Sequence, residues 1–174
     1  MKWPNKTDLV LLMIILVAYI PGLIYYQTLP EQVPMHWNIQ GQVDNYSSKN
    51  VAVFLLPSIN LAMYFLFLLL PKIDPSRKNY AYFTKSYNLI RWGFHLFFLT
   101  LQMFIVWNAL RLANGEESWN PSTIVVLSGS LLVIVMGNYM GRFRHNYFIG
   151  IRTPWTLANE EVWQQTHRLG AKLY

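Results

Sequence analysis

Apolar residues gather in four long runs that are separated by shorter, more polar segments. The runs cover Leu9–Tyr26, Val51–Leu70, Leu89–Leu112 and Ile124–Met140. Each run approaches the ~20 residues that a helix needs to cross the hydrocarbon core of a bilayer. A soluble domain of 174 residues could not cover so much apolar surface. The pattern therefore predicts an all-α integral membrane protein with four transmembrane helices.

The composition agrees with this prediction. Hydrophobic residues make up 53% of the chain and charged residues 13%, whereas soluble domains carry about 25% charged residues. Cysteine is absent from the sequence, which excludes disulfides, thiolate metal sites and cysteine nucleophiles. The first run is too long for the core of a secretory signal peptide. We therefore expect it to be a membrane helix.

The basic residues are unevenly distributed over the segments that join the runs. All fourteen Lys and Arg residues except Lys49 and Arg111 lie before the first run, beside the second loop or after the fourth run. Because cytoplasmic segments are enriched in Lys and Arg, both ends of the chain and the second loop are predicted to be cytoplasmic. These twelve residues are Lys2, Lys6, Lys72, Arg77, Lys78, Lys85, Arg91, Arg142, Arg144, Arg152, Arg168 and Lys172.

This topology gives one membrane domain over residues 1–174, with an extracellular loop at 28–50, a short second one at 113–121 and a cytoplasmic segment at 138–174. The lipid bilayer is the first predicted partner. The net charge of +6 follows from the topological bias, so direct nucleic-acid binding is not expected.

Several residues inside or beside the runs predict local structure. Thr7-Asp8 is expected to cap the first helix, and Pro21 to kink or end it. Asn60 is expected to bond to carbonyls freed by Pro57. For His95, Gln102 and Asn108 in the third run, packing and interface roles are favoured over a proton or substrate relay.

The fourth run carries a GxxxG step at Gly137 and Gly141. Small residues at this spacing let two helix backbones approach closely. Packing within one bundle is the favoured interpretation, and a dimer through these glycines is the alternative.

The loop at 28–50 has the pattern of a small extended structure. Pro30 and Pro34 prevent the first helix from continuing. Val33–Asn38 is predicted to be a short strand, and Gln40-Gly41-Gln42 can turn the chain into a hairpin.

Four residues of this loop are candidates for contact with a ligand or toxin: His36, Trp37, Asn38 and Asp44. Three interpretations stay open. The polar groups satisfy one another and water, or they contact a peptide, or His36 and Asp44 contribute to a metal site. Two metal ligands are too few without others, so no metal and no cofactor are expected.

The segment from Asn138 onward is rich in Trp, Arg, His, Thr and Asn. Thr153-Pro154 is expected to break the chain, and Asn159 to cap a new helix. The apolar residues of that helix share one face: Val162, Leu169 and Leu173, with Trp163 beside them. The segment is therefore predicted to contain a basic amphipathic helix in the inner membrane interface.

The string Gly150–Leu157, which reads Gly-Ile-Arg-Thr-Pro-Trp-Thr-Leu, is followed by Glu161-Val-Trp and Thr166-His-Arg. This pattern closely resembles the signature of the SdpI family of bacterial membrane proteins. The outer loop, with Leu-Pro, Val-Pro-Met-His-Trp-Asn and a later Ser-Lys, resembles the small domain of unknown function that precedes this signature. The two motifs occur in the family order, and the resemblance covers most of the chain.

The resemblance implies a membrane protein of Bacillus-type bacteria that confers immunity to a secreted peptide toxin. The best-known member also acts as a toxin receptor and draws a transcriptional repressor to the membrane. By this resemblance the outer loop meets the toxin and the inner signature supports protection or signalling. The signature residues are Asn138, Asn146, Arg152, Thr153, Pro154, Trp155, Thr156, Trp163, Thr166, His167 and Arg168.

Family members usually continue past a Thr-His-Arg-Leu-Gly segment into two further membrane helices, which gives six. The sequence is therefore expected to represent a shortened member or a portion of one.

Two other functional classes are alternatives to immunity. A membrane enzyme, such as a metal-dependent hydrolase, would use the cytoplasmic-face residues His145, His167, Glu160 and Glu161. No HExxH, GxSxG or phosphate-cradling motif is present. A small transporter would need more intramembrane polar residues than the runs contain. The favoured prediction has no catalytic residues.

Overall fold

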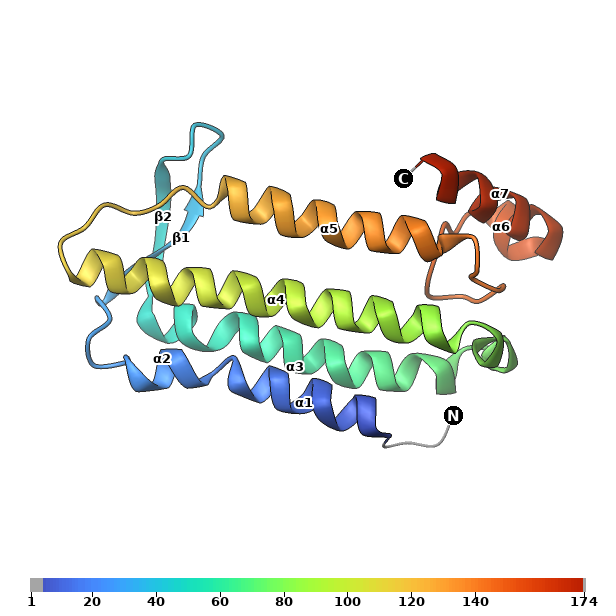
Figure 1. The fold of residues 1–174 in the computed structure, drawn as a ribbon, viewed down its shortest axis with the longest axis horizontal. Helices are drawn as coiled ribbons and strands as arrows, with labels where there is room; N and C mark the ends of the chain where they lie inside the picture. Colours follow the sequence, from blue (N-terminus) through green and yellow to red (C-terminus); the bar gives the residue numbers. More distant parts are fainter. Residues whose placement is uncertain (1–4, 174) are drawn as a thin grey trace. The chain divides into compact units, whose positions relative to one another are not determined.

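The structure is a computed structural model that describes residues 5–173. Lys2 and Tyr174, which the topology prediction included, lie outside the described residues. The elements follow in the order α1 (Lys6–Val17), α2 (Ile20–Ile24), β1 (Gln32–Trp37), β2 (Val43–Ser48), α3 (Lys49–Ile73), the 3-10 helix η1 (Arg77–Tyr82), α4 (Thr84–Ala113), α5 (Ser122–Met140), α6 (Pro154–Ala158) and α7 (Glu160–Leu173) (Figure 1).

Four helical segments of the described chain are long and apolar enough to cross a membrane, which confirms the predicted fold class. They are Lys6–Ile24, Lys49–Ile73, Thr84–Ala113 and Ser122–Met140. No more than 33% of the most apolar window of any of them is buried inside the protein, and for α5 the share is 11%. The large apolar surface that stays exposed is what helices in contact with lipid require.

The chain divides into two compact units, and α3, α4 and α5 contribute to both. The hairpin unit comprises the described residues 5–63 and 95–129. The tail unit comprises the described residues 64–94 and 130–173. The two predicted sites therefore fall in different units.

The first span is interrupted close to the expected proline. α1 ends at Val17 and α2 begins at Ile20. Pro21 has no N–H to donate to the carbonyl of Val17, four residues earlier, and its ring crowds that carbonyl.

The expected cap of the first helix was wrong: Asn5, not Thr7-Asp8, is the cap residue. Its Oδ1 accepts from the Asp8 N–H at 3.0 Å, and Asp8 Oδ2 accepts from the Asn5 N–H at 3.0 Å.

The core of the hairpin unit lies where the hairpin meets α3 and α4. Its buried residues are Leu29, Val33, Ala52, Val53, Phe104, Ile105 and Ala109. Gln102 of α4 donates from Nε2 to the carbonyls of Ala52 and Val53, at 3.3 Å each. A polar side chain thus ties the two helices together inside an apolar environment.

Asn60 bonds across to α4 and not to the carbonyls near Pro57, so that prediction was wrong. Its Oδ1 is 2.7 Å from His95 Nδ1, and its Nδ2 donates to the His95 carbonyl at 3.4 Å. Both side chains are buried. A partner on the neighbouring helix satisfies both ends of the amide, which the α3 backbone could not do. His95 is therefore a contact between α4 and α3.

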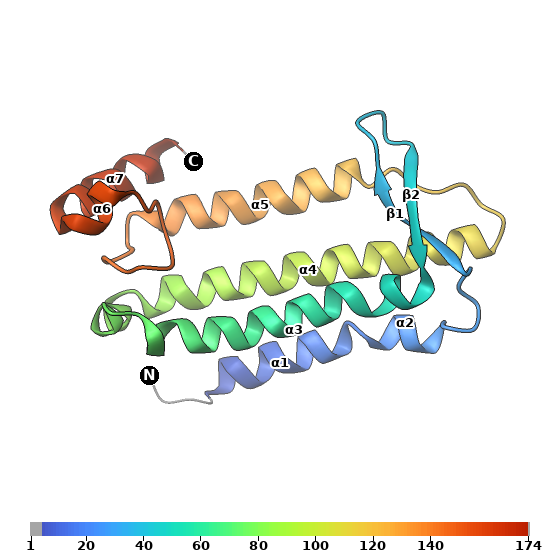
Figure 2. The ribbon, with the colours of Figure 1, turned by 180° about the vertical axis from the view of Figure 1, so that it is seen from behind.

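The tail unit contains a cluster of aromatic rings and the helices α6 and α7. These two helices lie side by side in both ribbon views (Figure 2). Phe83, which immediately precedes α4, lies 5.9 Å from Phe143 between ring centroids. α5 ends at Met140, so Gly141 follows the helix and does not lie on its surface. A Cβ on Gly141 would lie 3.5 Å from the Ala171 Cβ. Gly141 therefore faces α7 of the same chain at an ordinary contact distance, and the role of the Gly137–Gly141 step stays a prediction.

Candidate functional site

The loop after α2 forms the predicted hairpin. β1 and β2 are antiparallel, with Gln32 opposite Ser48 and Trp37 opposite Val43. At the turn the Asn38 N–H donates to the Gln42 carbonyl, and the Gly41 N–H donates to the Asn38 carbonyl, both at 2.9 Å. Gly41 has a φ of 79°, a conformation that favours glycine. The sequence Gln40-Gly41-Gln42 therefore turns the chain as expected.

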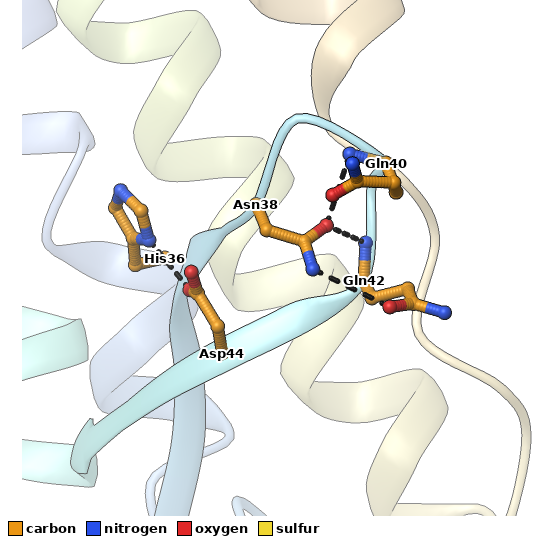
Figure 3. Close-up of polar contacts among 5 residues, drawn as sticks. All are labelled: His36, Asn38, Gln40, Gln42 and Asp44. Carbon is orange, nitrogen blue, oxygen red and sulfur yellow. Dashed lines mark hydrogen bonds and ion pairs between the residues drawn. The ribbon is translucent and has the colours of Figure 1, made fainter.

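Asn38 organises this turn with its side chain (Figure 3). Its Oδ1 accepts from the N–H groups of Gln40 and Gln42, at 3.0 and 2.9 Å. Its Nδ2 donates to Gln42 Oε1 at 3.3 Å. The side chain imitates a backbone turn, which is a common role of asparagine at this kind of position.

His36 and Asp44 form an exposed pair across the two strands (Figure 3). His36 Nδ1 lies 2.5 Å from Asp44 Oδ1, and the side chains are 67% and 40% exposed. The two residues project from neighbouring strands and remain open to solvent. They present an imidazole and a carboxylate to an approaching molecule.

Trp37 has a different position from the other three candidates. It packs against the core of the hairpin unit, with its ring 6.1 Å from that of Phe104. The exposed apolar side chains of the hairpin are instead Tyr46 and Ile39, which is 97% exposed. The loop is too short to show a periodic pattern of apolar residues. The sequence therefore did not predict which of its aromatic residues would face the core.

The second loop of the hairpin unit contacts the hairpin turn. A Cβ on Gly41 would overlap the side-chain amide of Asn120. Asn108, at the end of α4, holds this loop: its Oδ1 accepts from the Trp119 N–H at 2.8 Å, and its Nδ2 donates to Ser118 Oγ at 3.0 Å. Trp119 itself is exposed. The 113–121 loop therefore lies against the turn of the hairpin through Asn120.

In the tail unit, the signature begins with a loop organised by Asn146. This buried side chain accepts from the N–H groups of Phe148 and Ile149, at 3.0 and 2.7 Å. It donates to the carbonyls of Arg144 and Ile149, at 3.0 and 2.9 Å. All four bonding positions of the amide are used. Asn146 therefore holds the loop in its conformation through the hydrogen bonds of its side chain.

Trp163 and His167 form the buried face of α7, together with Gly170. The Trp163 indole N–H donates to the Phe143 carbonyl at 2.9 Å, and its ring stacks on the imidazole of His167 at 4.0 Å. His167 Nδ1 lies 2.7 Å from the Trp163 carbonyl, and Nε2 accepts from the Ile151 N–H at 2.9 Å. This arrangement requires a neutral imidazole with its proton on Nδ1.

Burial lowers the pKa of His167 below its ordinary value of 6.5, and the hydrogen bond to the Trp163 carbonyl opposes this effect. The neutral form that the geometry requires is therefore also the form that burial favours.

His145 has a comparable structural role. Its Nε2 is 2.9 Å from the Leu157 carbonyl, and its Nδ1 is 3.2 Å from Ser76 Oγ. Its own carbonyl accepts from Asn79 Nδ2 at 2.8 Å. The residue thus joins the signature loop to the segment between α3 and α4.

Asp74 completes this junction, and sequence reasoning did not identify it. Its Oδ1 accepts from the Ser76 N–H at 2.7 Å, and its Oδ2 accepts from the Tyr147 N–H at 2.9 Å and the Tyr80 hydroxyl at 3.1 Å. Burial, and next the Asp74 carboxylate, raise the pKa of Tyr80. The Asp-Pro-Ser sequence predicts the local turn, but it contains no signal for the contact to Tyr147.

α7 has the expected cap at Asn159, and α6 has a cap at Thr153 that was not predicted. The Thr153 Oγ1 accepts from the Thr156 N–H at 3.2 Å, and the Thr156 Oγ1 accepts from the Thr153 N–H at 2.8 Å. Asn159 Oδ1 accepts from the N–H groups of Glu161 and Val162, at 2.8 and 3.1 Å. Threonine and asparagine are favoured caps for this reason.

The remaining signature residues lie nearer the surface. The Arg152 guanidinium donates to the Tyr147 carbonyl at 3.0 Å, and Trp155 is 72% exposed. Thr166 is half-buried on α7. The exposed members are Asn138, Arg152, Pro154, Trp155 and Arg168. The signature thus separates into a buried scaffold and an exposed face.

Within residues 5–173, no group of three or more His, Cys, Asp or Glu side chains is placed to hold a metal ion. His145 and His167 lie in the tail unit, but the contacts described above occupy both nitrogens of each ring.

Together these features define a multi-pass helical membrane protein with a hairpin after its first span and a folded polar tail after its fourth. Sequence models of known families match both regions: a domain of unknown function (DUF1648) at residues 12–61 and the SdpI/YfhL protein family at residues 142–174. The chain is 30% identical over 169 residues to the Immunity protein SdpI of Bacillus subtilis strain 168. This similarity covers 97% of the chain and 76% of that protein.

The chain belongs to the SdpI/YfhL protein family. No solved structure matches it significantly.

Proposed function

We propose that this protein is a membrane immunity protein that protects a bacterial cell from a secreted peptide toxin. The observation that carries the proposal is the similarity to the Immunity protein SdpI of Bacillus subtilis over 97% of the chain. A similarity of this extent includes the hairpin and the folded tail as well as the apolar helices. Fold alone does not determine function, so a match in both polar regions is the stronger argument.

The exposed hairpin surface is the proposed contact for the toxin. The distribution of Lys and Arg supports an extracellular position for this loop and a cytoplasmic position for both ends of the chain. His36 and Asp44 supply polar groups, and Ile39 at the turn supplies an apolar one. A surface that combines an exposed apolar tip with an adjacent imidazole and carboxylate suits an amphipathic peptide. In this proposal Trp37 and Asn38 act indirectly, because they hold the strand and the turn.

The exposed face of the tail is the proposed site of protection or signalling at the cytoplasmic side. Arg152, Trp155 and Arg168 are available for contact there, whereas Asn146, Trp163 and His167 build the scaffold below. Arginine and tryptophan are the residue types that dominate protein interfaces. Recruitment of a transcriptional repressor, which the family resemblance implies, would use this face.

The proposed function is not catalytic. The contacts of His145 and His167 support this view, because each ring already uses both nitrogens to hold backbone or hydroxyl groups. A general base needs a free nitrogen within reach of its substrate. Burial also keeps His167 away from solvent.

Survival under toxin challenge tests the proposal. A Bacillus subtilis strain without its own immunity protein would express the wild-type chain with an epitope tag and be exposed to the secreted peptide toxin of that species. We expect survival to rise from the level of the empty-vector strain to that of a strain with its own immunity protein. Killing at the empty-vector level, with the tagged chain present in the membrane fraction, would overturn the proposal.

A further inference from the structure

A cavity of about 280 Å³ lies in the tail unit. It opens beside the end of α5, and its lining is mainly polar. The side chains around it are Tyr82, Arg142, Phe143, Arg144, Gln164 and Arg168. Three arginines therefore surround one small cavity.

These arginines come from two segments of the chain. Arg142 and Arg144 follow the last residue of α5, and Arg168 lies on α7. The two segments are in contact at Gly141: a Cβ at this position would lie at ordinary contact distance, 3.8 Å from the His167 carbonyl oxygen and 3.9 Å from the Arg168 Cα. This contact places Arg168 beside the segment that carries the other two arginines.

None of the three guanidinium groups forms an ion pair within the described part of the chain. Arg142 lies over the Tyr139 ring at 4.8 Å, and all three arginines are exposed. The negative end of the α5 dipole attracts positive charge and accounts for Arg142 and Arg144. It does not account for Arg168, which comes from a different helix.

We propose that this cavity binds the phosphate group of an anionic phospholipid. Guanidinium groups match phosphate oxygens with paired N–H donors and keep their charge at every physiological pH. The Gln164 amide and the Tyr82 hydroxyl provide further donors at the same cavity. A single headgroup would then join α5 to α7.

The position of the cavity favours a lipid over a soluble phosphate. Arg142 and Arg144 follow α5, a candidate membrane-spanning helix, by two and four residues, which is where headgroups lie. α7 also exposes the apolar residues Val162, Leu169 and Leu173 beside the buried face that packs on the tail unit. Such a helix suits the boundary between headgroups and acyl chains.

An adjoining cavity of about 230 Å³ shares Tyr82, Arg144 and Gln164 and is also lined by the carboxylate of Glu160. This negative charge lies on the α7 side of the site and opposes the binding of an anion. Glu160→Gln should therefore raise the affinity for an anionic lipid, whereas removal of an arginine should lower it.

The test is a lipid titration of the purified chain in detergent, read by native mass spectrometry as the fraction that retains one lipid. Phosphatidylglycerol and phosphatidylcholine both carry the phosphodiester, but only the first has a net negative charge. We expect the wild type to prefer phosphatidylglycerol by at least about five-fold. We expect Arg142→Gln/Arg168→Gln to abolish this preference.

The matched control is Arg77→Gln/Lys78→Gln, which removes two exposed positive charges from η1 of the same unit. It should keep the preference, and all variants should keep their unfolding midpoint. Equal binding of both lipids by the wild type, or an equal loss in the control, would overturn the proposal. Displacement of phosphatidylglycerol by inorganic phosphate at an equal concentration would overturn the assignment to a lipid.

Discussion

Replacing Gly150 by alanine tests how tightly the signature loop packs on α7. Gly150 has a φ of +122°, which residues with a side chain rarely adopt. A Cβ there would overlap His167 Nε2 and lie 3.2 Å from both His167 Cδ2 and Trp163 Cη2. The loop cannot move away from α7 without breaking the hydrogen bond that the Ile151 N–H donates to His167 Nε2.

Two costs contribute to the expected effect. The strained backbone costs about 1–2 kcal/mol, and the crowding of a packed core by one methyl group costs about 1–3 kcal/mol. The free energy of unfolding should therefore fall by about 2–5 kcal/mol. Gly115→Ala is the matched control, because Gly115 has a φ of +77° and open space where its Cβ would lie. Only the backbone cost, about 1–2 kcal/mol, applies to it.

The assay is denaturant unfolding of each purified variant in detergent, followed by tryptophan fluorescence. In a His167→Ala background the imidazole is gone, so the second change, Gly150→Ala, should cost much less than it does in the wild type. Equal losses for Gly150→Ala and Gly115→Ala would refute the argument. So would a cost of Gly150→Ala that is unchanged by the His167→Ala background.

Three further predictions concern the same unit. Asn146→Ala removes four hydrogen bonds and should lower the free energy of unfolding by about 2–4 kcal/mol, whereas the exposed Asn138→Ala should change it little in the same denaturation assay. Trp163→Phe loses the bond to the Phe143 carbonyl and should cost about 1–3 kcal/mol; an unchanged midpoint would contradict this. Because the folded-state pKa of His167 lies below 6.5, its stability contribution is complete above that pH and should fall as the pH drops towards the folded-state pKa. A pH series of unfolding midpoints checks this, and His167→Gln should flatten it.

The membrane spans and the hairpin were predictable because their causes are local. A helix in lipid needs a run of about twenty apolar residues, and no other part of this chain contains one. Pro30, Pro34 and the Gln40-Gly41-Gln42 turn fix the hairpin through backbone geometry. Asn159 was recognisable as a cap because asparagine before a helix bonds to N–H groups only two or three residues away.

Contacts between distant segments were not predictable in the same way. Asn60 carries a general need for a partner, but only the packing of α3 on α4 shows that the partner is His95. Asp74 reads as an ordinary turn residue, although its carboxylate also accepts the Tyr147 N–H. The signature string likewise does not show that Trp163 is buried while Trp155 is exposed. That difference arises because Trp163 lies on the face of α7 that packs on Phe143.

Contact between the exposed surface of the hairpin and a toxin is open to a direct genetic test. Toxin-challenged Bacillus subtilis cells would express the wild type, His36→Ala/Asp44→Asn, or Glu117→Gln, an exposed charge change in the neighbouring loop. At equal membrane levels, we predict that the wild type and Glu117→Gln protect and that the hairpin variant loses most protection. Full protection by His36→Ala/Asp44→Asn would contradict the account.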